Sequence, residues 1–338
     1  MSDSRNTTGQ PLYLVTGAAG FVGQHLVTYL LDRGIRVRAM VRKEEQGAAL
    51  KAMGAEVVIA DLQKPETLAS AAQNVAGIYH IGAIFRVDSI PDKEFYDINA
   101  EGVRRILDAA IDAGVPRMVH CSTNGVHSHI AHPPADENAP LNPGDVYQDS
   151  KLVGENIAMD YFKEGKIKGV VLRPAMIYGP GDQRTLKLFR MIDKRKFFYV
   201  GPGTAYTHWL DVRDLAHAFH LAMEHEDINH EAFLIGGGVY QTLKETVSEI
   251  ARQLEVPETK LHLPTAPVMA LAHVIEAVCR PFGIEPPLFP RRVSFFLKNR
   301  AYDISKAQRM LGFQPRLSFP EEVSEIIAAY RQSGDLSS

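Results

Sequence analysis

Cysteine is scarce in this sequence, and the scarcity limits the kinds of protein it can encode. Only Cys121 and Cys279 are present among 338 residues, too few for a framework of disulfides. Such a low cysteine content is typical of proteins that work in the reducing cytosol. The first residues are polar and lack the apolar core of a signal peptide, so we expect a cytoplasmic protein.

Long apolar runs and basic blocks are also missing. The most apolar stretch, residues 267–278, is too short to cross a bilayer and carries His273 and Glu276. We interpret it as a buried or substrate-facing helix, with shallow contact to a membrane as the alternative. The net charge is −3, and no basic cluster is of the kind that follows a phosphate backbone. We therefore expect neither a membrane span nor a nucleic acid partner.

Two further classes of site lack their motifs. The thirteen histidines are not accompanied by the cysteines or paired carboxylates of a metal site, so we predict no metal. The G-x-S-x-G turn of a serine hydrolase is absent as well. The 45% of apolar and 23% of charged residues are typical of a folded globular chain.

The first half of the chain alternates short β-branched segments with amphipathic ones. This alternation predicts a parallel sheet covered by helices on both faces, an α/β fold of the Rossmann-type, doubly wound class. Strands are predicted at residues 12–16, 36–41, 55–62, 77–83, 117–123, 169–179 and 232–237, and helices at 21–34, 65–75, 94–114 and 211–224.

Beyond about residue 180 the alternation weakens, and residues 257–300 are rich in proline, aromatic and bulky aliphatic side chains. We predict a dinucleotide-binding Rossmann domain over residues 11–180 and about 208–240. A smaller C-terminal substrate lobe is predicted over about 181–207 and 241–330.

A glycine-rich segment, VTGAAGFVG at residues 15–23, joins the first predicted strand to the first predicted helix. Its glycines let the backbone approach a diphosphate, which the positive N-terminus of the helix then binds. A tight turn without a ligand is the alternative interpretation. We predict that the dinucleotide is bound here by Gly17, Ala19, Gly20, Phe21, Val22 and Gly23.

The end of the second predicted strand indicates which dinucleotide is bound. NAD sites carry a carboxylate there for the ribose 2′-hydroxyl, whereas a 2′-phosphate needs an arginine nearby. Arg42 and Lys43 follow this strand, which favours NADP(H). NAD(H) stays possible, because both cations can be solvated loop charges and Glu44 can still reach a ribose. At the end of the next strand, Asp61 and Leu62 are expected at the adenine edge.

Hydroxyl, phenol and ammonium groups are expected to meet where the cofactor binds. The strands of a parallel sheet end at one crevice, so Ser122 and Thr123 should lie beside the glycine loop. Tyr147 follows at the start of a predicted helix, and Lys151 lies one helical turn beyond it.

The Tyr-x-x-x-Lys pattern by itself is not specific, because it occurs three times. Tyr240/Lys244 and Tyr302/Lys306 have no hydroxyl residue at a strand end before them, and we interpret both as surface pairs. The position of Tyr147, and not the pattern, distinguishes the first pair.

A lysine beside a tyrosine makes the phenol a better proton donor. A free phenol titrates near ~10. An ammonium about 4 Å away, at an effective dielectric constant of ~20, stabilises the phenolate by roughly 4 kcal/mol. That interaction lowers a pKa by at most about three units. Tyr147 is therefore a candidate general acid and base for a carbonyl or hydroxyl substrate, with Thr123 hydrogen-bonded to the same oxygen.

Eight segments appear in one order: VTGAAGFVG, DL at 61–62, YHIGA, DINAEG, CSTNGVHS, YQDSK, LRPAMIYGPGD and YDISKAQRMLGFQP. Over about residues 12–330 they resemble the extended short-chain dehydrogenase/reductases, also called the NAD-dependent epimerase/dehydratase family. The resemblance implies that Tyr147 and Lys151 are catalytic together with Thr123, Ser122 being the alternative hydroxyl. It also implies that the cofactor site includes Gly82, Ala83, Asn99, Arg173 and Pro174.

The branch of the family depends on the segment AYTHWLDVRDLA. Members that act on nucleotide sugars commonly carry an Arg-Asp pair where Thr207 and His208 stand here. The apolar C-terminal part is similar to the 3β-hydroxysteroid dehydrogenase and dihydroflavonol reductase branches, which implies an oxidoreductase for a hydrophobic keto or hydroxy substrate. One alternative is a nucleotide-sugar epimerase or dehydratase, with Arg184, Lys187 or Arg190 on the phosphates. Another is a dinucleotide-sensing protein without catalysis.

Several side chains near predicted strand ends are candidates for contact with the substrate, although simple packing explains each of them as well. They are Phe85, Asn124, His127, Tyr178 and His208, with Arg86 and Trp209 as further candidates for the pocket wall. The resemblance also implies a homodimer, formed through the helix at 94–114 and the helix that starts at Tyr147.

Overall fold

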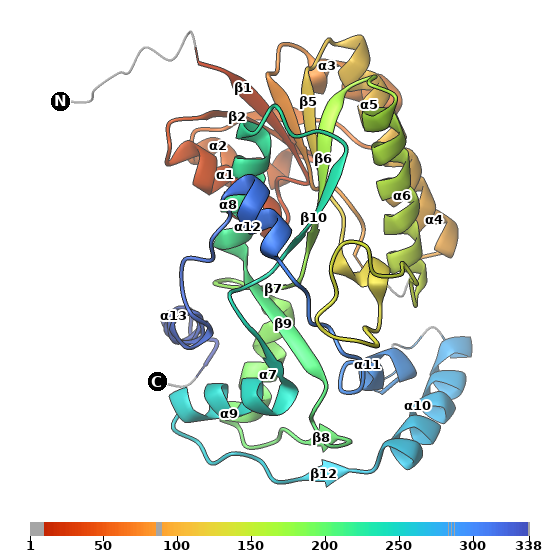
Figure 1. The fold of residues 1–338 in the computed structure, drawn as a ribbon, viewed down its shortest axis with the longest axis vertical. Helices are drawn as coiled ribbons and strands as arrows, with labels where there is room; N and C mark the ends of the chain where they lie inside the picture. The colour runs from red at the N-terminus through yellow and green to blue at the C-terminus, as the bar shows by residue number, and fades with distance from the viewer. Residues whose placement is uncertain (1–9, 86–89, 283, 285, 287, 337–338) are drawn as a thin grey trace, which may run out of the picture.

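A seven-stranded parallel sheet forms the centre of the protein (Figure 1). The computed structural model describes residues 10–85, 90–282, 284, 286 and 288–336. The strand order is β10-β6-β5-β4-β1-β2-β3, which is the predicted doubly wound Rossmann-type arrangement. The strands are β1 (Leu12–Thr16), β2 (Arg36–Val41), β3 (Glu56–Ile59), β4 (Gly77–His80), β5 (Arg117–Cys121), β6 (Lys168–Pro174) and β10 (Glu231–Ile235).

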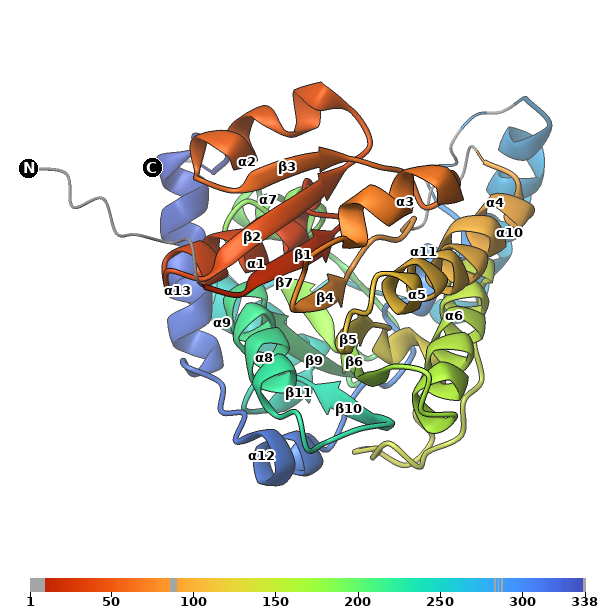
Figure 2. The ribbon, with the colours of Figure 1, turned by 90° about the horizontal axis from the view of Figure 1, so that it is seen from above.

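Helices cover both faces of this sheet (Figure 2). One face packs against α1 (Phe21–Leu31), α8 (Val212–Glu224) and α12 (Ser305–Leu311). The other packs against α3 (Pro65–Ala72), α5 (Gly102–Asp112) and α6 (Val146–Lys163). The short helices α2 (Ala48–Ala52) and α4 (Asp92–Tyr96) complete this part.

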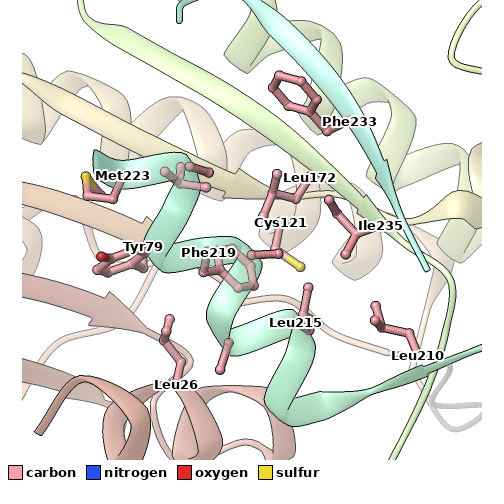
Figure 3. Packing of buried hydrophobic residues seen from close by; sticks show 14 of the residues in the cluster. Leu26, Tyr79, Cys121, Leu172, Leu210, Leu215, Phe219, Met223, Phe233 and Ile235 are labelled. Carbon is pink, nitrogen blue, oxygen red and sulfur yellow. The ribbon is translucent and has the colours of Figure 1, made fainter. Parts of the chain in front are cut away.

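Burial on both faces explains why the central strands lack polar alternation. All five residues of β5 are buried, as expected for a strand between two helical layers. Figure 3 shows α8 packed on one face of the sheet next to α1, with Phe219 near Tyr79 and Leu26. The rings of Phe219 and Tyr79 lie edge to face with their centres 6.3 Å apart, a favourable aromatic geometry.

The long helix predicted at 94–114 is interrupted. A π-helical turn at Asp97–Glu101 separates α4 from α5 and carries Asn99, which is completely buried. Its amide Nδ2 donates to the Ser150 hydroxyl and to the Ile84 carbonyl, and its Oδ1 accepts from the Ile84 N–H. The widened turn thereby ties α6 to the segment after β4, an arrangement that helical periodicity does not reveal.

The predicted strands at 55–62, 77–83 and 117–123 end earlier than expected, at Ile59, His80 and Cys121. The strand predicted at 169–179 is divided in two. Its first part, β6, ends at Pro174, and the second, β7 (Met176–Tyr178), belongs to a separate sheet. In each case the residues beyond the sheet turn away and contribute to a cavity at its carboxyl edge.

A smaller group of elements lies beyond that edge. Strands β7, β9 (Tyr206–Asp211) and β11 (Tyr240–Thr242) form one small sheet, and β8 (Tyr199–Val200) pairs with β12 (His262–Leu263). The helices here are α7 (Gln183–Asp193), α9 (Leu243–Gln253), α10 (Thr265–Cys279), α11 (Pro290–Ser294) and α13 (Phe319–Gln332), with short 3₁₀ turns elsewhere at Glu44–Gln46, Asn124–His127 and Arg280–Phe282.

Two elements do not follow the predicted division of the chain. Strand β9 belongs to the small sheet, although residues 208–240 were assigned to the Rossmann domain. Helix α12 packs near α8 and β10, where Lys306 contacts Glu231 at 2.7 Å, although it falls within the predicted lobe. The division into two domains stays a prediction.

Helix α10 is not the buried helix that its composition predicted. Only Ala272 is buried, and Leu271, Val274 and Val278 are each more than half exposed. None of its described residues lines the cavity at the edge of the main sheet. The prediction of a buried or substrate-facing helix at 267–278 is therefore wrong for this structure. Within the described ranges no helix combines the length and the apolar character needed to cross a bilayer.

A buried carboxyl group joins the C-terminal helix α13 to the end of β7. The Tyr178 hydroxyl donates to Oε2 of Glu322, whose side chain is only 2% exposed. Burial raises the pKa of the Glu322 carboxyl to about 8, against the hydrogen bond from Tyr178 and together with the charges of Asp211 and Asp214.

We expect this carboxyl to make folding stability depend on pH. Its pKa in the folded state lies above the ordinary value of 4.5, so the folded protein retains the proton more tightly than the unfolded chain. The resulting stabilisation is complete below that ordinary value and is lost as the pH rises through about 8. The free energy of unfolding should therefore fall with pH by up to about 1.4 kcal/mol per pH unit in this range, and Glu322→Gln should remove this dependence.

Urea unfolding at several pH values checks this expectation. The exposed Glu325 on the same helix supplies the control variant Glu325→Gln, which should keep the slope of the wild type. Identical slopes for the wild type and Glu322→Gln would show that the buried carboxyl does not titrate as described.

Candidate active site

A cavity of about 870 Å³ opens at the carboxyl edge of the main sheet. Its walls come from the segments that follow β1 to β6 and from α7. It lies where the strand order reverses between β1 and β4, the usual position of ligands in doubly wound sheets. Its volume is within the range of ligand and cofactor sites.

The glycine segment after β1 requires residues without a side chain. Gly17 has φ +67°, and a Cβ there would lie 2.9 Å from the Cα of Gly82. A Cβ on Gly23 would clash with the carbonyl oxygen of Gly17. Helix α1 starts directly afterwards, and no side chain caps its N-terminus, which leaves its first N–H groups for an anion. The segment therefore fits a dinucleotide diphosphate.

The neighbouring turn after β4 is held by the last residue of β1. The Thr16 hydroxyl oxygen accepts hydrogen bonds from the N–H groups of Ile81 and Gly82 at 3.1 and 2.9 Å. It therefore donates its own hydrogen to Nδ1 of His80, 2.8 Å away. These bonds fix the backbone of Gly82 and Ala83, both of which line the cavity.

At the far end of the cavity, Arg42, Asp61 and Leu62 belong to the lining, whereas Lys43 and Glu44 do not. The N–H groups of Arg42 and Lys43 both donate to the side-chain oxygen of Gln46 at 3.2 Å. This bonding shapes the loop so that one of the two predicted cations faces the cavity.

The predicted catalytic residues Thr123, Tyr147 and Lys151 line the same cavity. Lys151 is 3% exposed, and its ammonium donates to the carbonyl oxygen of Cys121 at 2.6 Å. Burial lowers the pKa of Lys151, while Cys121 and Glu155 act in the opposite sense. The Tyr147 ring lies edge to face against Phe85, with the ring centres 4.9 Å apart. The sheet end and the start of α6 thus bring the three residues together.

The two candidate hydroxyls have different partners. Ser122 donates to Oε2 of Glu155 at 2.5 Å, so its hydrogen points away from the cavity. The Thr123 oxygen accepts from the N–H of Gly125 at 3.0 Å, which leaves its hydrogen available to a ligand. The geometry favours Thr123 over Ser122 as the hydroxyl that contacts a substrate.

A buried polar network lies behind this wall. Oε1 of Glu155 accepts from Nε and Nη2 of Arg173 at 2.9 and 2.5 Å. Nη1 of Arg173 donates to Nε2 of His127, so Nδ1 of His127 carries the hydrogen that goes to the Pro140 carbonyl. Burial, and then the Arg173 charge, lower the pKa of His127. Arg173 and His127 therefore support the wall without lining the cavity, and only Pro174 of the predicted Arg-Pro pair does so.

Phe85 and Asn124 are the two predicted substrate residues that line the cavity. Three others do not: His127 and Tyr178 have the internal partners described above, and His208 has partners of its own. Its Nδ1 accepts from the Tyr302 N–H and its Nε2 donates to the Gly237 carbonyl. The prediction of a direct substrate contact is corrected for these three residues. Trp209 lines the cavity, and Arg86 lies outside the described residues.

The second and third Tyr-x-x-x-Lys pairs differ from each other. Tyr240 is 37% exposed, as a surface pair requires. Tyr302 is 2% exposed and packs between His127 and His208, so its prediction as a surface residue is wrong. In the part of the chain that the structure describes, no group of His, Cys, Asp or Glu side chains is arranged to hold a metal ion.

The sequence alone did not indicate several lining residues: Gln148, Met176, Ile177, Leu188, Phe295 and Arg300. Met176 and Ile177 come two and three residues after Pro174, and the break of the strand at this proline is the signal that could have identified them. Phe295 and Arg300 come from a distant segment, and no local pattern places them here.

The family follows from comparison with known proteins. The model of the NAD dependent epimerase/dehydratase family matches residues 13–236, so the chain belongs to this family. The match confirms the resemblance seen in the motifs, and the protein is an NAD(P)-dependent enzyme of the short-chain dehydrogenase/reductase type.

Relatives of similar length include named oxidoreductases. The chain is 29% identical over 327 residues to the 4-hydroxy-2-methyl-3-oxo-4-farnesyl-3,4-dihydroquinoline-1-oxide ketoreductase of Stigmatella aurantiaca, covering 95% of this chain and 96% of the relative. It is 28% identical to the 3 beta-hydroxysteroid dehydrogenase/Delta 5→4-isomerase of Mycobacterium tuberculosis, covering 98% and 93%.

Solved structures share the fold over almost the whole chain. The crystal structure of gox2253 is 27% identical, with a TM-score of 0.79 and coverage of 97% of this chain and all of that one. A UDP-glucose 4-epimerase from Thermotoga maritima reaches a TM-score of 0.77 at 20% identity, covering 95% and 99%, which is a likeness of fold.

Gly23→Ala should weaken dinucleotide binding, because its methyl group displaces the Gly17 carbonyl and opens the glycine segment. We expect a loss of at least about tenfold in affinity for NADPH, measured by calorimetry. Gly238→Ala is the matched control, since a Cβ there meets no atom within 4 Å. Equal affinities of the two variants would contradict this account of the glycine segment.

Proposed function

We propose that the protein is an NADP(H)-preferring ketoreductase or alcohol dehydrogenase that acts on a hydrophobic keto or hydroxy substrate. The observation that carries the proposal is that Thr123, Tyr147 and Lys151 line the same cavity as the glycine segment. A protein that only sensed dinucleotides would have no use for a proton donor at this place.

The chemistry of each residue follows from its partners. When bound, the nicotinamide supplies or accepts the hydride. The Thr123 hydroxyl donates a hydrogen bond to the substrate oxygen, and the Tyr147 phenol donates a proton to it. The Lys151 ammonium, held by the Cys121 carbonyl, stabilises the phenolate that remains. In the direction of oxidation Tyr147 accepts the proton instead.

The cavity wall supports a hydrophobic substrate. Many of the side chains that line it are apolar, among them Ile84, Phe85, Met176, Ile177, Leu188, Trp209 and Phe295. Relatives named for a farnesyl dihydroquinoline and for 3β-hydroxysteroids point to the same class of substrate.

Two observations disfavour a nucleotide-sugar substrate. Thr207 and His208, at the positions where an arginine would bind the diphosphate, are buried and bonded internally. Of the three cations that could bind the phosphates of such a substrate, Arg184 lines the cavity, whereas Lys187 and Arg190 do not. Arg190 pairs with Asp335. We keep a homodimer through α5 and α6, and a cytoplasmic location, as expectations from the sequence.

The direct experiment follows nicotinamide absorbance while the protein acts on aromatic, steroid-like and β-keto compounds with NADPH or NADH. Steady oxidation of the cofactor supports the reductase. Isomerisation of a sugar nucleotide without a change in absorbance would support an epimerase instead. Binding of the cofactor with neither reaction would support a sensor.

Tyr147→Phe should lower kcat by about 10² to 10⁴, because it removes the proton donor and keeps the ring packed on Phe85. Dinucleotide affinity should change little. Tyr240→Phe makes the same chemical change in an exposed Tyr-x-x-x-Lys pair and should leave turnover unchanged. Full turnover of Tyr147→Phe with a confirmed substrate would falsify the proposed mechanism.

Arg42→Ala should abolish the preference for NADPH. It removes the cation expected on the 2′-phosphate, so we expect about tenfold weaker binding of NADPH and unchanged binding of NADH. Lys43→Ala removes a neighbouring charge outside the cavity wall and should alter neither affinity. A preference for NADH that is lost on replacing Glu44 would reverse the assignment.

A further inference from the structure

Arg184 is a cavity residue whose side chain is anchored at one end. It lies in the first turn of α7, and its Nε donates to Oδ1 of Asp182 at 2.9 Å. Asp182 is 2% exposed and also accepts from the N–H groups of Arg184 and Thr185, which caps the helix. Its Nη2 donates to the carbonyl oxygen of Ile177 at 3.4 Å, and among the described residues Nη1 has no hydrogen-bond partner. The Nη1 group is therefore available to a ligand.

The guanidinium group lies between two aromatic rings from different parts of the sheet edge. Its central carbon is 5.5 Å from the ring centre of Phe21 and 5.3 Å from that of Phe85, both within the range of cation–π attraction. Phe21 is the first residue of α1, and Phe85 packs on the ring of Tyr147. Arg184 thus contacts both the start of α1, next to the glycine segment, and the aromatic ring that packs on Tyr147.

A bound anionic ligand would account for this position better than the pair with Asp182 does. A pair in which the arginine is 46% exposed contributes little to stability. Even with the hydrogen bond from Nη2 to Ile177, it leaves the Nη1 donors unused. A guanidinium group presents parallel donors that match the oxygens of a phosphate. The uncapped N-terminus of α1, next to Phe21, is where the diphosphate of a dinucleotide is expected.

We propose that Arg184 binds the diphosphate of the dinucleotide from the side of α7, while the N–H groups of α1 bind it from the glycine segment. The inference rests on the proposed function, since it assumes that a dinucleotide occupies the cavity. It assigns to α7 a part in cofactor binding that does not depend on the 2′-phosphate. NADPH and NADH therefore share this contact.

Binding experiments without turnover test the assignment. The single tryptophan, Trp209, lines the cavity, so its fluorescence reports on binding of NADPH, NADH and ADP-ribose. Arg184→Ala should weaken all three by the same factor, about tenfold or more, because each carries the diphosphate. Adenosine 2′-monophosphate, which lacks it, should bind as to the wild type. Arg184→Lys should recover part of the loss as a point charge.

Two variants serve as controls. Lys187→Ala removes a cation from the exposed side of the same helix and should leave all affinities unchanged. Arg42→Ala should weaken the binding of NADPH and of adenosine 2′-monophosphate, and it should leave the binding of NADH and of ADP-ribose unchanged.

The outcomes separate this inference from the proposed function. The inference alone would be overturned if Arg184→Ala bound ADP-ribose with an affinity within twofold of that of the wild type. It would also be overturned if Arg184→Ala weakened only the binding of uridine diphosphate or of the substrate. Failure of the wild type to bind any dinucleotide would overturn the proposed function, and the inference with it.

Discussion

The hydrogen bond from the Lys151 ammonium to the Cys121 carbonyl is the contact on which the site depends. It joins α6 to the end of β5, and the other catalytic candidates lie at fixed distances along the chain from its two partners. Thr123 follows Cys121 by two residues, and Tyr147 precedes Lys151 by one helical turn. A buried cation needs such a partner, because desolvation otherwise opposes its charge. One bond thereby sets the positions of hydroxyl, phenol and ammonium together.

The buried polar groups behind the cavity wall determine which hydroxyl group faces the cavity. Glu155 accepts a hydrogen bond from the Ser122 hydroxyl and forms an ion pair with Arg173. The Ser122 hydroxyl is thereby directed into the interior, which leaves the Thr123 hydroxyl for a ligand. A buried ion pair of this kind is weak evidence for stability, because burying two charges costs about as much as their attraction returns. Its effect here is on orientation, since it determines which hydroxyl faces the cavity.

Sequence patterns predicted the sheet, the glycine segment and the presence of Thr123, Tyr147 and Lys151 around one cavity, because each depends on local residues and on the rule that parallel strands end at one edge. They failed where distant partners decide the outcome. His127 and His208 look like pocket residues until Arg173 and Tyr302 are known to hold them. The apolar composition of α10 does not reveal that the helix lies exposed, and nothing local places Phe295 or Arg300 in the wall.

The most direct test of the central claim is the absorbance titration of the Tyr147 phenol, taken as the difference between proteins with and without Tyr147→Phe. It is made once with Lys151 present and once in the variant Lys151→Met. The account predicts that the signal of this phenol appears at a lower pH when Lys151 is present. The same midpoint in both backgrounds would contradict it.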